Sequence, residues 1–187
     1  MHKLSDFFYR FSYGWVALTA TLVFVLFSVL TLPGQSRIAQ TYSQGSGSPD
    51  TSLFYNAEDL YSMAGLYGAQ GREAYLKARW TFDLAFPVVY SFFFIAAISW
   101  LLNRITPPGS RWRLLNLVPV AAFVLDLLEN TATSLVMARF PLHCPPGELL
   151  APILTPIKWL MVSASMLILL LASAYHLVAA IRRKKTV

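Results

Sequence analysis

Apolar residues in this chain gather into four long stretches separated by polar segments. The stretches cover residues 15–32, 80–102, 114–137 and 159–181. A helix needs about 20 apolar residues, each rising about 1.5 Å, to cross the hydrocarbon core of a bilayer. The pattern therefore predicts an all-α, polytopic membrane protein with a four-helix transmembrane bundle. We expect residues 1–187 to form a single membrane domain.

The longest segment between predicted spans covers residues 33–70. Its stretch 44–49 is rich in glycine and serine, which is typical of a linker without packed structure. A short helix is predicted over residues 56–64, with Asn56 as its N-cap and Gly65 as its end. We expect this short extracytoplasmic helix to lie on the bilayer surface or across the outer mouth of the bundle.

Charge placement predicts the topology. The net charge of +6 could indicate nucleic acid, but the basic residues lie beside the ends of the spans. They are Lys3 and Arg10, then Arg104, Arg111 and Arg113, then Arg182, Arg183, Lys184 and Lys185. Basic residues in short segments beside spans mark the cytoplasmic side. We therefore expect a plasma-membrane protein with both termini cytoplasmic and with membrane lipids, not nucleic acid, as partners.

The chain offers few groups that could hold a cofactor or a metal. Its one cysteine, Cys144, excludes an internal disulfide and a Cys-x-x-Cys site. His143, Cys144 and Glu148 are three candidate ligands on a proline-rich segment, which is a weak signal. We therefore predict no cofactor and no metal site.

A line of polar residues leads into the second predicted span. Steps of three and four residues place its members on one face of a helix continuous over residues 70–102. The members are Arg72, Leu76, Arg79, Asp83, Pro87 and Tyr90. Pro87 is expected to kink this helix and to free the backbone carbonyl of Asp83. The simpler alternatives are an ion pair of Arg79 with Asp83 at the headgroups and a packed aromatic role for Tyr90.

The third span carries the most informative residues, Asp126, Glu129 and Asn130, on one helix face. Ionisable groups at membrane depth rarely face lipid and usually mark a pathway or a site. Counting about 1.5 Å of helix per residue from the basic residues at the cytoplasmic ends of the spans places these residues between the bilayer midplane and the outer surface. We expect a polar pocket that opens to the outer leaflet, with acids at its base and basic groups at its rim.

These residues divide into two sets of candidates. The candidates for acid–base chemistry are Asp126, Glu129 and Asp83, and those for ligand binding are Arg72, Arg79, Tyr90, Asn130 and Lys158. Since no arginine or lysine of the spans is expected at the depth of Asp126, one acid of the Asp126–Glu129 pair should hold its proton at neutral pH. One structural alternative is a buried network of hydrogen bonds that joins the helices. Another is that the Lys158 side chain snorkels, so that its ammonium reaches the membrane interface.

Three segments resemble those of uncharacterised small four-span microbial membrane proteins. They are residues 67–75 (YGAQGREAY), 83–90 (DLAFPVVY) and 126–130 (DLLEN). The likeness covers about the middle third of the chain and brings no established activity with it. The layout is also similar to that of four-span sterol-isomerase-type proteins, which line an intramembrane cavity with acids, but no motif is shared.

The leading functional hypothesis is a pocket that binds or transforms an amphiphilic, lipid-like ligand with acid–base groups. An isomerase, cyclase or hydrolase would fit within it. The first alternative is an accessory subunit of a larger membrane complex, whose acids pair with charges on a membrane-protein partner. The second is a proton-coupled carrier, which would require a homo-oligomer because four helices rarely enclose a pathway.

The topology gives the first prediction. With both termini in the cytoplasm, a cysteine placed at Ser46 should react with an impermeant reagent in intact cells, and one placed at Thr186 should not. Labelling of the Thr186 position in intact cells would overturn this topology.

Overall fold

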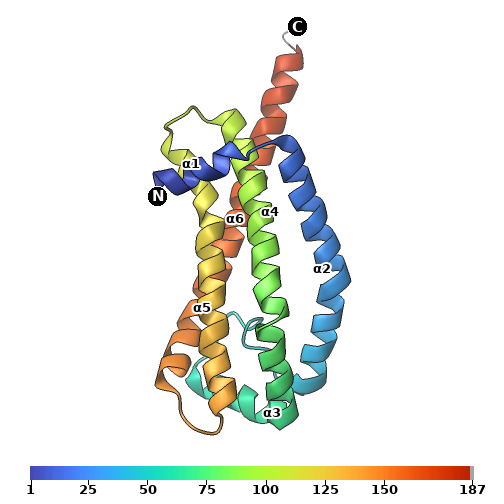
Figure 1. Ribbon diagram of the computed structural model, residues 1–187, viewed down its shortest axis with the longest axis vertical. Helices are drawn as coiled ribbons and strands as arrows, with labels where there is room; N and C mark the ends of the chain where they lie inside the picture. The colour runs from blue at the N-terminus through green and yellow to red at the C-terminus, as the bar shows by residue number, and fades with distance from the viewer. Residues whose placement is uncertain (186–187) are drawn as a thin grey trace. The chain divides into compact units, whose positions relative to one another are not determined.

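The computed structural model describes residues 1–185, which are almost entirely helical and contain no strand. The elements in chain order are α1 (His2–Arg10), α2 (Gly14–Ser43), α3 (Ala57–Arg79), α4 (Phe82–Ile105), the 3-10 helix η1 (Arg111–Leu117), α5 (Val118–Arg139) and α6 (Pro145–Lys185) (Figure 1). Thr186 and the side chains of Arg183, Lys184 and Lys185 lie outside the described residues.

Four helical segments are long and apolar enough to cross a membrane. They are Gly14–Ser43, Ala57–Ile105, Arg111–Arg139 and Pro145–Arg182. The prediction of an all-α, polytopic membrane protein is therefore confirmed. Helix α2 extends beyond the stretch predicted for the first span and continues through Pro33 to Ser43. A proline removes one helical hydrogen bond, and helices of membrane proteins tolerate that loss.

The chain forms two compact units. Unit 1 consists of Met1–Val25, Val89–Ala122 and the described part of Met161–Val187. Unit 2 consists of Leu26–Val88 and Phe123–Leu160. Helices α2, α4, α5 and α6 each contribute residues to both units.

In unit 1, helix α1 is attached to η1 through polar groups. The hydroxyl of Ser5 donates to Asn116 Oδ1 at 2.8 Å, and the buried Asn116 amide donates to Ser99 Oγ at 3.1 Å. The hydroxyl of Tyr9 donates to the carbonyl of Arg113 at 2.8 Å. The opposite side of α1 and its end leave Leu4, Phe7 and Phe11 about half exposed. An apolar face turned outward is typical of a helix that lies along a membrane interface.

In unit 2, helix α3 is longer than the short helix predicted over residues 56–64. Asn56 is its N-cap, as predicted, and forms a capping box with Asp59. The helix does not end at Gly65. It kinks at Gly68, whose φ of 63° suits glycine, and then continues to Arg79.

Helix α3 then gives way to α4, and the continuous helix predicted over residues 70–102 is wrong at this point. Trp80 and Thr81 form a turn between the two helices, with the Thr81 amide donating to the carbonyl of Ala78 at 3.3 Å. The Thr81 hydroxyl donates to the carbonyl of Lys77 at 2.6 Å, which satisfies a backbone group at the end of α3.

The core of unit 2 lies among α3, α5 and the start of α6. Its buried apolar residues are Leu60, Ala64, Tyr67, Tyr75, Ala132, Val136, Met137, Cys144 and Ala151. The closest approach is at Gly147 of α6, where a Cβ atom would lie 2.7 Å from the carbonyl oxygen of Ala132. Small residues at such contacts let membrane helices pack backbone against backbone.

This contact gives the second prediction. Gly147→Ala should lower the thermal stability, because the added methyl meets backbone of α5 that cannot rotate away. Gly34→Ala on α2 is the matched control. No atom lies within 4 Å of a Cβ at Gly34, so that variant should be unchanged or slightly more stable. Equal melting temperatures for the two variants, measured in the same detergent, would contradict the close packing of α5 and α6.

Candidate functional site

The guanidinium of Arg79 is the centre of a buried ionic group in unit 2. Its Nη2 lies 2.9 Å from Asp50 Oδ2, and its Nε lies 3.1 Å from Asp83 Oδ2. Arg79 ends α3, Asp83 lies in the first turn of α4, and Asp50 comes from the segment between α2 and α3. We call Asp50, Arg79 and Asp83 the arginine triad. Arg79 is only 7% exposed, so its charge depends on these partners.

Asn130 on α5 joins this triad to the backbone of α4. Its Oδ1 accepts from Arg79 Nη1 at 3.3 Å, and its Nδ2 donates to the backbone carbonyl of Asp83 at 2.9 Å. That carbonyl lies four residues before Pro87, which has no amide hydrogen to donate to it. The sequence predicted a freed carbonyl at Asp83, and the structure supplies its partner.

A second ionic group surrounds Lys158 of α6. Its ammonium contacts Glu129 Oε2 and lies 4.0 Å from Asp126 Oδ1. The Thr155 hydroxyl donates to Glu129 Oε1 at 2.7 Å, and Tyr55 hydrogen-bonds to Thr155 at 2.9 Å. We call Asp126, Glu129 and Lys158 the lysine triad.

The lysine triad corrects two expectations. A cation does reach the depth of Asp126, so the argument for a proton held by the Asp126–Glu129 pair loses its premise. Lys158 is 5% exposed and points to these acids, so it does not snorkel to the interface. Asp126, Glu129 and Asn130 are buried within the chain, as the sequence led us to expect.

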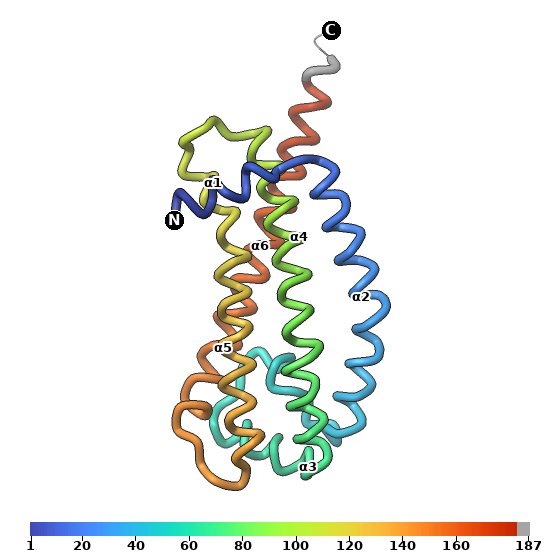
Figure 2. The backbone as a smooth tube through the Cα atoms, in the orientation of Figure 1, coloured from blue at the N-terminus to red at the C-terminus, as the bar shows by residue number. Residues whose placement is uncertain are grey.

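The segment between α2 and α3, which Figure 2 traces, is held in place by aromatic side chains. The indole of Trp159 donates to the backbone carbonyl of Asp50 at 2.8 Å, and the Tyr67 hydroxyl donates to that of Gly47 at 3.2 Å. Ser48 and Pro49 are buried. The prediction of a linker without packed structure over residues 44–49 is therefore wrong, because its backbone and Ser48 are bonded into unit 2.

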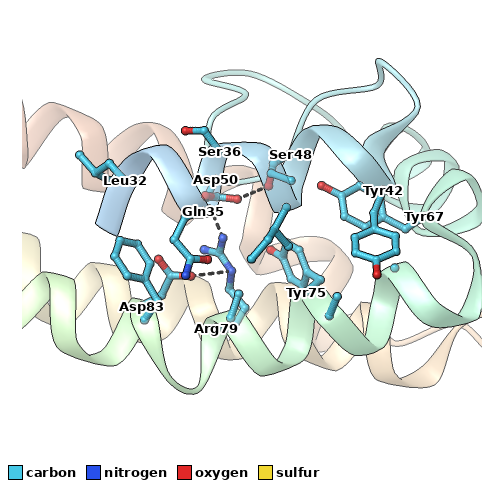
Figure 3. Close-up of a pocket in the computed structure, with 16 residues that line it drawn as sticks. Leu32, Gln35, Ser36, Tyr42, Ser48, Asp50, Tyr67, Tyr75, Arg79 and Asp83 are labelled. Atoms are coloured by element: carbon cyan, nitrogen blue, oxygen red, sulfur yellow. Dashed lines mark hydrogen bonds and ion pairs between the residues drawn. The ribbon is translucent and has the colours of Figure 1, made fainter. Parts of the chain in front are cut away.

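A cavity of about 140 Å³ lies beside the arginine triad. One face of α2, one face of α3, the start of α4 and the 48–50 segment form its walls. The lining residues are Leu32, Gln35, Ser36, Ile38, Ala39, Tyr42, Ser48, Asp50, Tyr67, Gly71, Ala74, Tyr75, Ala78, Arg79, Phe82 and Asp83. Figure 3 shows the triad joined by ionic contacts, with Gln35 directed from α2 toward Arg79 and Asp83.

Tyr75 forms part of the cavity wall. Its ring lies against the Arg79 guanidinium, at 4.6 Å from the ring centroid to Cζ. Its hydroxyl is buried, with no surface open to the cavity, and faces the Thr133 side chain of α5.

The predicted site residues do not all come together. Arg79 and Asp83 line the cavity, whereas Asp126, Glu129, Asn130 and Lys158 are absent from its lining. The roles proposed for them in catalysis and binding stay predictions.

Arg72 and Tyr90 lie away from the cavity lining. Arg72 donates to the carbonyl of Ala64 at 2.9 Å and lies over the ring of Phe140, so it supports the kink in α3. Arg72 is absent from the cavity lining, and the rim role predicted for it stays a prediction. Tyr90 belongs to unit 1, where it is buried and packs edge-on against Phe94.

Sequence reasoning missed Asp50, Tyr67 and Tyr75. The two tyrosines could have been identified by their spacing, because Tyr67, Gly71, Tyr75 and Arg79 follow one another at steps of four residues. The indication for Asp50 was weaker: it is the only acid between the first predicted span and the helix that begins after Asn56.

Asp50 lies outside the membrane-spanning helices, and its charge responds to its surroundings. Burial raises the pKa of its carboxyl, but the Arg79 guanidinium and the hydrogen bond from Ser48 outweigh burial and hold the pKa below its usual value. The charged form is therefore favoured in the folded protein.

This shift gives the third prediction. A carboxyl with a lowered folded-state pKa stabilises the fold above its ordinary pKa, and the contribution is lost as pH falls through the lowered value. Asp50→Asn should therefore lower the melting temperature at pH 7 by about 2–4 °C, corresponding to about 1 kcal/mol, because Asp50 is partly exposed and Arg79 keeps Asp83 as a partner. The difference in melting temperature between this variant and the wild type should decrease toward pH 3. The exposed Glu73→Gln on α3 is the control, and a gap that does not change with pH would contradict the ionic role of Asp50.

Comparisons with known proteins give no match. No family model, no curated protein and no solved structure matches this chain.

Proposed function

We propose that this polytopic membrane protein binds the polar head of an amphiphilic, lipid-like molecule in the cavity beside the arginine triad. The observation that carries the proposal is a cavity lined by Arg79 and by its two carboxylate partners, Asp50 and Asp83. Packing alone gives no reason to keep three charges around an open space.

The size and walls of the cavity favour a headgroup over a whole lipid. Its volume of about 140 Å³ is close to that of a cavity that holds a benzene-sized molecule, about 150 Å³. On the α2 side its wall includes Leu32 and Ile38, which are 38% and 44% exposed. An apolar chain attached to a bound head could leave along this side toward the hydrocarbon that surrounds a membrane helix.

The basic clusters support a position for this cavity in the membrane. With both termini in the cytoplasm, the 44–56 segment that carries Asp50 follows the first crossing and lies on the opposite side. The ligand would then come from the outer leaflet of the plasma membrane.

The lysine triad favours binding in a monomer over an accessory role. Lys158 already pairs with Glu129 and lies near Asp126 within one chain, so these acids need no charge from another subunit. The proposal assigns them to holding α5 and α6 together, and it gives the ligand contacts to the arginine triad and Tyr75.

Filling the cavity gives the fourth prediction. Ala74→Leu adds a branched side chain at the cavity wall, whereas Ala69→Leu adds the same group at an exposed position of the same helix. Native mass spectrometry of the purified proteins should show a co-purified amphiphile on the wild type and on Ala69→Leu. The amphiphile should be lost from Ala74→Leu while its melting temperature is retained. Equal retention by the two variants would place the ligand elsewhere, and a wild type without bound amphiphile would remove the proposal.

A further inference from the structure

The cavity carries an excess of negative charge. Among its lining residues Asp50 and Asp83 are acidic and Arg79 alone is basic, so the wall has a formal charge of −1 when all three are ionised. The neighbouring lysine triad has the same excess, with two acids around one ammonium. In a medium of low dielectric constant, this imbalance attracts a cation and repels an anion.

Arg79 has little capacity left for an anionic ligand. Its Nη2 contacts Asp50, its Nε contacts Asp83, and its Nη1 donates to Asn130. A phosphate or carboxylate would have to displace one of these oxygens and would leave a buried carboxylate without its partner. The expectation that arginines hold an anionic headgroup therefore has no support from the contacts of Arg79.

The remaining walls suit a positively charged group. Tyr42, Tyr67, Tyr75 and Phe82 add aromatic rings to the lining. Aromatic faces beside a carboxylate attract ammonium groups through the negative potential above each ring. The charge and the aromatic lining thus favour the same class of ligand.

We infer that the cavity selects an amine-bearing headgroup, an ammonium carried on an apolar chain, with Asp50 and Asp83 as its counter-charges. This inference rests on the proposed function, because it names the class of ligand for the same cavity. Asp50 is the counter-charge that can turn to the ligand with least disturbance, because Arg79 keeps its contact with Asp83 on the neighbouring helix.

The test compares two probes with the same twelve-carbon chain, dodecyltrimethylammonium and dodecyl phosphate. Each is titrated into the purified protein in a neutral maltoside detergent, and bound probe is counted by native mass spectrometry. The wild type should retain the ammonium probe about tenfold better than the phosphate probe. Asp50→Asn should reduce ammonium retention about tenfold, and Glu73→Gln on the exposed side of α3 should leave it unchanged.

A second variant keeps the test decisive if Asp50→Asn folds poorly. Tyr42→Leu removes an aromatic face from the half-buried wall of α2 and should lower ammonium retention about two- to fivefold. Equal retention of both probes, or preference for the phosphate, would overturn the inference. If that binding were still lost in Ala74→Leu, the proposed cavity would stand without its charge selectivity. If neither probe bound, or if Ala74→Leu bound both probes as well as the wild type does, both proposals would be wrong.

Discussion

The arrangement of unit 2 depends on the need to compensate one guanidinium away from water. A charged side chain at the centre of a membrane helix costs at least about 2.5–3.5 kcal/mol, and an unpaired buried charge destabilises a fold by about 3–5 kcal/mol. The start of α4, the segment after α2 and helix α5 each bring an oxygen to Arg79 and offset this cost. Pairing Arg79 therefore fixes where these three parts meet.

Stability alone does not explain why the chain keeps these charges. Apolar side chains of similar volume often replace a buried ion pair at no cost, because they need no desolvation. The lysine triad is enclosed, and Thr155 and Tyr55 extend its bonding, so a structural role accounts for it. The arginine triad differs because it borders open space. This difference between two similar groups makes the arginine triad the better candidate for function.

The sequence predicted the parts of the fold that depend on local pattern. Long apolar stretches identified the spanning helices, and the step from Asp83 to Pro87 predicted a free carbonyl that Asn130 satisfies. The continuous helix predicted over residues 70–102 was wrong because periodicity assumes an unbroken helix, and Trp80 and Thr81 form a turn between α3 and α4. Asp50 was missed because its partner, Arg79, is distant along the chain, and only packing of the segment against Trp159 brings the two together.

The composition of the arginine triad bears on how a site can bind a cation without losing its own structure. If Arg79 had a single carboxylate partner, a cation that bound this carboxylate would leave the guanidinium buried and unpaired. With two acids, Arg79 keeps its contact with Asp83 when Asp50 turns to a ligand, so the guanidinium stays paired. Asp83 is fixed on α4, whereas Asp50 lies between helices, where backbone adjusts at lower cost. In the proposed cation site, the second acid would allow one buried group to serve both the fold and the ligand.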